Sequence, residues 1–101
     1  ATVAKLVLSA DEFEIVSQLN RAVADHPTVQ FGSYPFGEGF DLGRGEGLPK
    51  TIITLESNLA DDVEAAAKTL KDSIQPELIV DCVIGSDSLL DANQGIINGI
   101  K

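Results

Sequence analysis

A short glycine-rich stretch is the part of this sequence that looks most like a binding site. The stretch from Phe31 to Lys50, FGSYPFGEGFDLGRGEGLPK, holds six of the nine glycines, and its Gly37, Gly39 and Gly43 spell GxGxxxG. A phosphate-binding loop needs a strand before it and a helix N-terminus after it, usually with a lysine or hydroxyl nearby. Here an alternating strand pattern follows, and three acidic residues oppose the single Arg44. The sequence therefore favours a long hairpin loop over a phosphate site.

Aromatic residues in and before this loop are the candidates for contact with a partner. Loop phenylalanines such as Phe36 and Phe40 either dock onto a neighbouring domain or subunit or fold back over the open face of a sheet. Tyr34, at the predicted end of a strand, either offers its hydroxyl to a ligand or satisfies the local backbone. The predicted interface or ligand contacts are Ser33, Tyr34, Pro35, Phe36, Phe40 and Arg44.

Three further side chains have the chemistry of catalytic residues. Asp25 and His26 are the one acid–imidazole neighbour pair. The spacing places no Ser or Cys beside them, and a histidine at a helix C-terminus is commonly a capping partner. Cys82, within IVDCVIG, is expected to be a core thiol and not a nucleophile. Asp81 beside it is either a solvent-facing carboxylate or a buried functional acid, and the sequence leaves both readings open.

A cluster of acids offers a last candidate for a cation site. Asp61, Asp62 and Glu64 lack the alternating pattern and the glycine turn of a calcium loop. Negative charge in the first turns of a helix is favourable and explains them. No complete acid–base, nucleophile or metal set is present in the sequence. We therefore predict no catalytic, cofactor-binding or metal-binding residue in this chain.

Length and charge restrict the class of protein and its partners. The 101 residues suffice for one domain with one core. Seven basic against sixteen acidic residues give a net charge of −9, and the basic residues are scattered. We therefore expect no binding to nucleic acid or to a membrane, since phosphate groups are bound chiefly by clustered Lys and Arg and no apolar run is long enough to span a bilayer. With a single cysteine and no signal-peptide pattern, the chain is predicted to be intracellular and cytoplasmic.

Hydrophobic periodicity predicts the elements that position these residues. A capping box of Ser9 and Glu12 predicts the start of a first helix, which ends at His26 before Pro27. The apolar stripe of this helix is predicted to be Phe13, Ile15, Val16, Leu19, Ala22 and Val23. Apolar and alternating runs predict four strands, at Val3–Ala10, Thr28–Tyr34, Lys50–Ser57 and Glu77–Gly85.

A second helix lies between the third and fourth strands. Asn58 or Ser57 is its predicted cap, and Pro76 closes it. Its predicted buried stripe is Val63, Ala66, Ala67, Leu70 and Ile74.

The resulting order, β-α-β-β-α-β, predicts an α+β fold of the ferredoxin-like type. In this sandwich a four-stranded antiparallel sheet carries both helices on one face. Residues 1–85 would form the domain, with a long glycine-rich hairpin loop at 36–49. Residues 86–101 would form a C-terminal helix or connecting arm, in which Gly95 and Gly99 weaken the helical pattern.

Two short motifs carry a resemblance to a known family. The strand ending in GSYP, Gly32–Pro35, and the strand ending in TLES, Thr54–Ser57, resemble the small α+β subdomain that follows the molybdopterin-binding-like domain in CinA-type proteins and in FAD synthases. The resemblance extends from Val3 to Ile84. The acidic, glycine-rich insertion from Phe36 to Gly47 is longer than the hairpin expected in that family.

The resemblance implies a division of labour between domains. In such proteins the adenylyltransferase and nucleotide pyrophosphatase activities, with FAD, ATP and Mg, belong to other domains, so no catalytic residue is carried over to this chain. It thus implies a non-catalytic auxiliary domain that packs on a neighbouring domain or on a second subunit. The alternatives are a free-standing small-ligand or regulatory module, with a ligand at a dimer interface lined by Tyr34 and Arg44, and an enzyme that uses His26 or Asp81.

Overall fold

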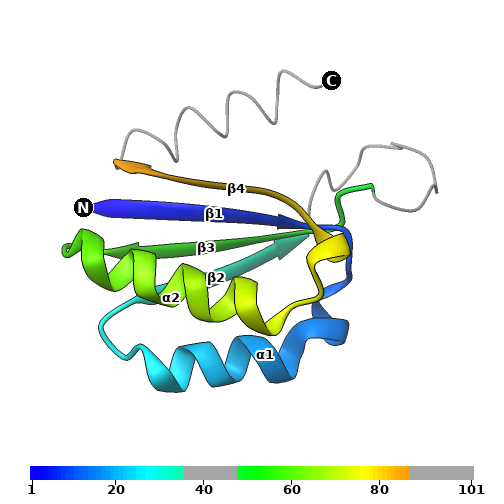
Figure 1. The fold of residues 1–101 in the computed structure, drawn as a ribbon, viewed down its shortest axis with the longest axis horizontal. Helices are drawn as coiled ribbons and strands as arrows, with labels where there is room; N and C mark the ends of the chain where they lie inside the picture. The colour runs from blue at the N-terminus through cyan, green and yellow to red at the C-terminus, as the bar shows by residue number, and fades with distance from the viewer. Residues whose placement is uncertain (36–47, 87–101) are drawn as a thin grey trace.

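The computed structural model describes residues 1–35 and 48–86, with the exception of the Ser86 side chain. The described residues form four strands and two helices in the order β-α-β-β-α-β (Figure 1). The elements are β1 (Thr2–Leu8), α1 (Glu12–Asp25), β2 (Gln30–Pro35), β3 (Thr51–Ser57), α2 (Ala60–Ser73), the 3-10 turn η1 (Pro76–Leu78) and β4 (Ile79–Ser86).

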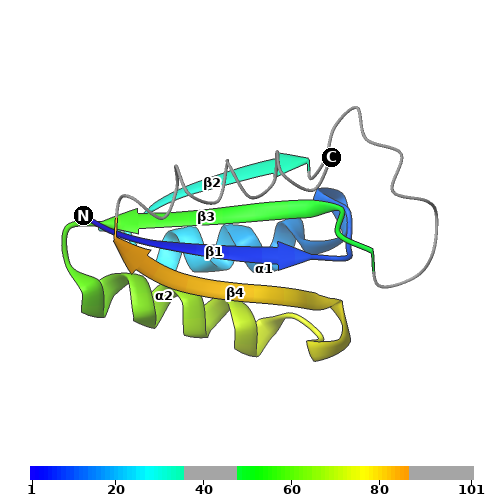
Figure 2. The same ribbon diagram turned by 90° about the horizontal axis from the view of Figure 1, so that it is seen from above.

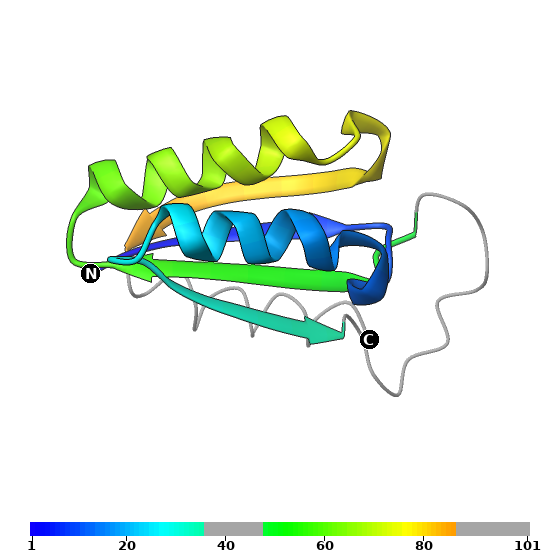
Figure 3. The ribbon, with the colours of Figure 1, turned by 90° about the horizontal axis from the view of Figure 1, so that it is seen from below.

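The strands form one sheet in the order β2-β3-β1-β4, and every neighbouring pair is antiparallel (Figure 2). Both helices lie side by side on the same face of this sheet (Figure 3). The predicted ferredoxin-like fold is therefore confirmed, including the antiparallel pairing of the two middle strands. The predicted C-terminal arm and the tip of the glycine-rich loop lie outside the described residues.

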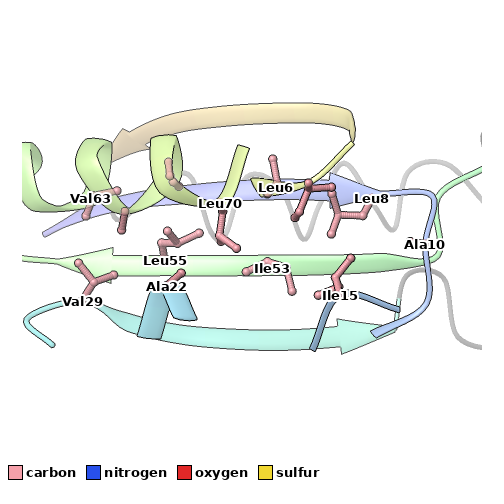
Figure 4. Close-up of a cluster of buried hydrophobic side chains, with 14 residues drawn as sticks. Leu6, Leu8, Ala10, Ile15, Ala22, Val29, Ile53, Leu55, Val63 and Leu70 are labelled. Carbon is pink, nitrogen blue, oxygen red and sulfur yellow. The ribbon is translucent and has the colours of Figure 1, made fainter. Parts of the chain in front are cut away.

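The core lies between the sheet and the two helices. Alternate residues of the central strand β1, Ala4, Leu6 and Leu8, point to the helices, as do Ile53 and Leu55 of β3. Each large aliphatic side chain buried here contributes roughly 1.5–3 kcal/mol to stability. Figure 4 shows Leu6, Leu8, Ile53 and Leu55 of the sheet among side chains of the helices, which include Ile15, Ala22, Val63 and Leu70.

The start of α1 differs from the prediction by two residues. Asp11, and not Ser9, is the N-cap, and the backbone N–H of Asp11 donates to the carboxylate of Glu14 at 2.9 Å. Ser9 is held elsewhere, because its N–H and its hydroxyl both donate to the carbonyl oxygen of Leu78, at 2.8 and 3.4 Å. The predicted end is confirmed, since His26 is the C-cap.

The predicted apolar stripe of α1 is only partly correct. Ile15 and Ala22 are buried and Leu19 packs against the core. In contrast, 77% of Phe13, 40% of Val16 and 45% of Val23 is exposed. These three residues have spacings of three and seven, so they follow one line along a helix of 3.6 residues per turn, on a side that the sheet does not cover. We call Phe13, Val16 and Val23 the exposed row of α1.

Helix α2 buries the predicted residues but starts differently. Val63, Ala66, Ala67, Leu70 and the following Ile74 are all buried, as predicted. The N-cap position is held by Leu59, and not by Asn58 or Ser57, and no side chain caps the helix there. The Ser57 hydroxyl oxygen instead accepts the N–H of Leu59 at 3.3 Å. Within the described residues, neither helix is long and apolar enough to cross a membrane.

Candidate functional site

The predicted contact residues Ser33, Tyr34 and Pro35 lie together in one hollow of about 180 Å³ at the end of β2. The other predicted contacts, Phe36, Phe40 and Arg44, lie outside the described residues. The hollow is completed by two residues at the start of α1, Asp11 and Glu12, and two at the start of β3, Lys50 and Thr51.

Backbone and side-chain hydrogen bonds fix one wall of this hollow. The N–H of Lys50 donates to the carbonyl oxygen of Leu8 at 2.7 Å. The hydroxyl of Thr51, itself buried, donates to the carbonyl oxygen of Ala10 at 2.6 Å. The start of β3 is thus tied to the connection between β1 and α1, and the two charged side chains of that connection are held beside the end of β2.

Tyr34 lies back along its own strand, above Gly32. A Cβ atom added at Gly32 would come within 2.8 Å of the Tyr34 hydroxyl oxygen and 2.9 Å of its Cε2. It would also come within 2.7 Å of Oγ1 of Thr54, which is the cross-strand partner of Gly32. Glycine at this position therefore gives the tyrosine ring its place on the sheet. The ring remains 55% exposed.

The charges around the hollow limit what it can bind. Asp11 and Glu12 stand against Lys50, so the described lining carries one more negative than positive charge. The hollow has no imidazole beside it, because Glu12 in its lining begins α1 whereas His26 ends this 14-residue helix, about 20 Å farther along its axis at 1.5 Å per residue. The described lining therefore offers hydrogen-bonding groups and a tyrosine ring, and lacks a nucleophile paired with a base.

The sequence itself decides the family. Residues 2–83 match the family described as FAD synthase, middle domain. The chain belongs to this family. The FAD synthase part of the resemblance carried by GSYP and TLES is thereby confirmed, and the chain is an auxiliary domain of the FAD synthase type.

The solution NMR structure of a de novo designed protein with ferredoxin fold is similar at 14% sequence identity and a TM-score of 0.40, and the match covers 83% of this chain and 79% of that chain. No curated protein matches the sequence significantly.

His26 of the middle domain joins the two helices. Its Nε2 lies 2.7 Å from Oγ1 of Thr69 in α2. The Thr69 hydroxyl donates to the carbonyl oxygen of Ala65 at 3.1 Å, so its oxygen accepts the Nε2–H of His26. The histidine predicted as a helix-end partner therefore links α1 to α2, and the described residues around it form no catalytic set.

Asp81 and Cys82 occupy the edge strand β4. Asp81 is exposed, and its carboxylate accepts the N–H of Cys82 at 2.8 Å. This geometry favours the solvent-facing reading of Asp81 over a buried functional acid. Cys82 packs against the core, and burial raises the pKa of its thiol. The predicted core thiol is therefore half-buried at the margin of the core.

One of the acidic residues at the start of α2, Asp62, makes a hydrogen bond within the fold. The carboxylate of Asp62 accepts the hydroxyl of Thr28 at 2.7 Å. Within residues 1–35 and 48–86, no three His, Cys, Asp or Glu side chains are grouped so that they could hold a metal ion. Asp62 also lines a hollow of about 460 Å³ that includes Glu56. Two carboxylates make this hollow unfavourable for a phosphate group.

Proposed function

We propose that this middle domain is a non-catalytic auxiliary domain that packs on a neighbouring domain of the same FAD synthase-like polypeptide. The observation that carries the proposal is the family match over residues 2–83. A domain described as the middle one has a neighbour on each side, and a small fold with one packed core is well suited to hold two neighbours in a fixed arrangement. FAD, ATP and Mg would be handled by those neighbours.

The exposed row of α1 is the surface that would meet the neighbouring domain. Phe13 is the largest apolar side chain left in water on the described surface, and Val16 and Val23 continue the row along the helix. Removal of such side chains from water is worth about 25 cal/mol per Å² of apolar area. A row of this kind marks an interaction surface more often than a lone exposed leucine does.

The charged residues around this row indicate which charges the partner surface should carry. Glu12, Glu14 and Asp25 of α1 oppose its single basic residue, Arg21. A complementary surface would carry an apolar centre that receives Phe13 and a rim of Lys and Arg. A second copy of the same acidic helix is disfavoured as the partner, because the two helices would repel each other.

The small-ligand alternative has the hollow at Tyr34 in its favour. Its volume of about 180 Å³ is below the roughly 300–1,000 Å³ that is typical of ligand pockets. We therefore place this function second. Ligand-observed NMR with nucleotides, flavins and amino acids tests it: binding that is lost in a Tyr34→Ala variant would favour a ligand module over the packing domain. The link to CinA-type proteins remains a prediction.

The packing proposal is tested by substitution in the full-length protein. We expect Phe13→Glu to separate the thermal unfolding of the middle domain from that of its neighbours and to speed proteolysis between the domains. Leu59→Glu is the matched control, since Leu59 is 61% exposed and lies outside the row. Equal unfolding and proteolysis in wild type, Phe13→Glu and Leu59→Glu would refute the proposal.

A further inference from the structure

The sheet has a second face, opposite the helices, that is unexpectedly buried. Val3, Lys5 and Val7 of β1 point to this face, since their neighbours Ala4, Leu6 and Leu8 point to the core. Val3 is 0% exposed, Lys5 is 6% exposed and Ile52 of β3, which pairs with Val7, is 6% exposed. Both helices cover the other face (Figures 1 and 3). We call this surface the outer face of the sheet.

The outer face buries a lysine side chain, that of Lys5. It lies on the central strand between Thr54 of β3 and Val83 of β4. Among the described residues no carboxylate forms an ion pair with it. Burial lowers the pKa of its ammonium group, as expected when a charge is removed from water without a compensating partner.

The position of the buried residues indicates which part of the chain covers them. Two segments lie outside the described residues, 36–47 and 87–101. The first leaves β2 after Pro35 and returns before β3, whereas Val3 lies at the other end of the sheet, opposite Glu56 and Gly85. The second begins directly after Ser86, which pairs with Thr2. The fifteen residues 87–101 therefore begin next to the end of the sheet at which Val3 lies.

The composition of residues 87–101 fits the outer face. The outer face already carries the carboxylates of Glu56, opposite Val3, and Asp81, opposite Val7, so the fit of the segment rests on its length and its apolar residues and not on charge. As a helix, fifteen residues would extend about 22 Å, close to the roughly 23 Å of the seven-residue β1. Its apolar residues recur at near-helical intervals and are Leu89, Leu90, Ile96, Ile97 and Ile100.

We propose that residues 87–101 dock on the outer face of the sheet of their own chain, over Val3, Lys5 and Ile52. The docked segment closes the open side of the sandwich and makes the middle domain a three-layered unit. A neighbouring domain would then meet the exposed row of α1 or the docked segment, and not the sheet.

The reactivity of Lys5 tests this docking. In the 101-residue chain we expect Lys5 to be acetylated by a small reagent at least tenfold more slowly than the exposed Lys50, as followed by mass spectrometry. The double substitution Ile96→Asp and Ile100→Asp should bring the two rates within about threefold of each other. Gln94→Asp adds a charge to the segment without removing an apolar residue, and should leave Lys5 protected.

Three results of the acetylation experiment would overturn the proposal. The first is equal acetylation of Lys5 and Lys50 in the unaltered chain, and the second is protection of Lys5 that persists in the double variant. The third is protection that falls on dilution, which would assign the outer face to a second copy. If the double variant does not fold, NOEs between the methyl groups of Ile96 or Ile100 and those of Val3 or Val7 in the unaltered chain decide the matter, and their absence overturns the proposal.

Discussion

The ring of Tyr34 occupies the space that a side chain at Gly32 would need. The hydroxyl oxygen and Cε2 of the tyrosine lie 2.8 and 2.9 Å from the position of an added Cβ. The first and third residues of the GSYP motif thus form one packing unit on β2. Gly32 is required by the close approach of Tyr34 and Thr54, and the motif has a structural explanation that is independent of any ligand.

Gly32→Ala tests this unit. The added methyl group should push the tyrosine ring off the strand and lower the free energy of unfolding by about 0.5–1.5 kcal/mol, as overpacking is partly offset by the lower entropy of the unfolded chain. Chemical denaturation measures the change, and NOEs from residue 32 to the Tyr34 ring report the ring position. Unchanged NOEs in the variant would show that the two side chains do not compete for space.

His26→Ala should loosen the contact between the helices. The Nε2–H to Thr69 hydrogen bond of 2.7 Å is lost, which should lower the free energy of unfolding by roughly 0.5–1.5 kcal/mol. A double-mutant cycle with Thr69→Val isolates this term. A coupling free energy near zero would mean that the bond contributes nothing to stability.

Burial of Cys82 should make stability depend on pH in the alkaline range. The pKa of the thiol is raised in the folded state, so the unfolded chain loses this proton first. The contribution of Cys82 is fully present below the unfolded pKa of about 8.5 and decreases as the pH rises above it. Denaturant titrations of wild type and Cys82→Ala between pH 7 and 10 measure the difference. A difference that does not vary with pH would contradict the assignment.

Phe13→Ser should leave the isolated 101-residue chain nearly as stable as the wild type. With 77% of Phe13 exposed, little apolar area returns to water on unfolding, and we expect a change within about 0.5 kcal/mol. Leu70→Ala, at a fully buried position, should cost about 2–5 kcal/mol and serves as the contrast. A loss of more than about 2 kcal/mol for Phe13→Ser would show that Phe13 belongs to the core of the domain.

The sequence predicts the architecture well because strand and helix periods are local properties. The alternation in TIITLES placed Ile53 and Leu55 on one face of β3, and both lie in the core. Helix faces are harder to predict. Apolar residues at Phe13, Val16 and Val23 widen the stripe of α1 beyond what a sheet can cover, and periodicity does not show which side meets the sheet.

The hollow at Tyr34 could be predicted only in part, for a topological reason. Ser33, Tyr34 and Pro35 are adjacent in sequence, and their grouping was predictable. Asp11 and Lys50 reach the hollow through β1–β3 pairing and the hydrogen bond of Thr51 to Ala10, which no local pattern encodes. The lysine at position 5, within an otherwise apolar strand, was a signal in the sequence, but its burial depends on what covers the outer face.

The proposed packing of α1 on a neighbouring domain is tested most directly by hydroxyl-radical footprinting of Phe13. The oxidation rate of this side chain is measured in the isolated 101-residue chain and in the full-length protein, with the oxidation rate of Leu59 in both samples as the reference. We predict that Phe13 is oxidised at least fivefold more slowly in the full-length protein while Leu59 is unchanged. Equal oxidation of Phe13 in the two samples would contradict the packing role of this helix.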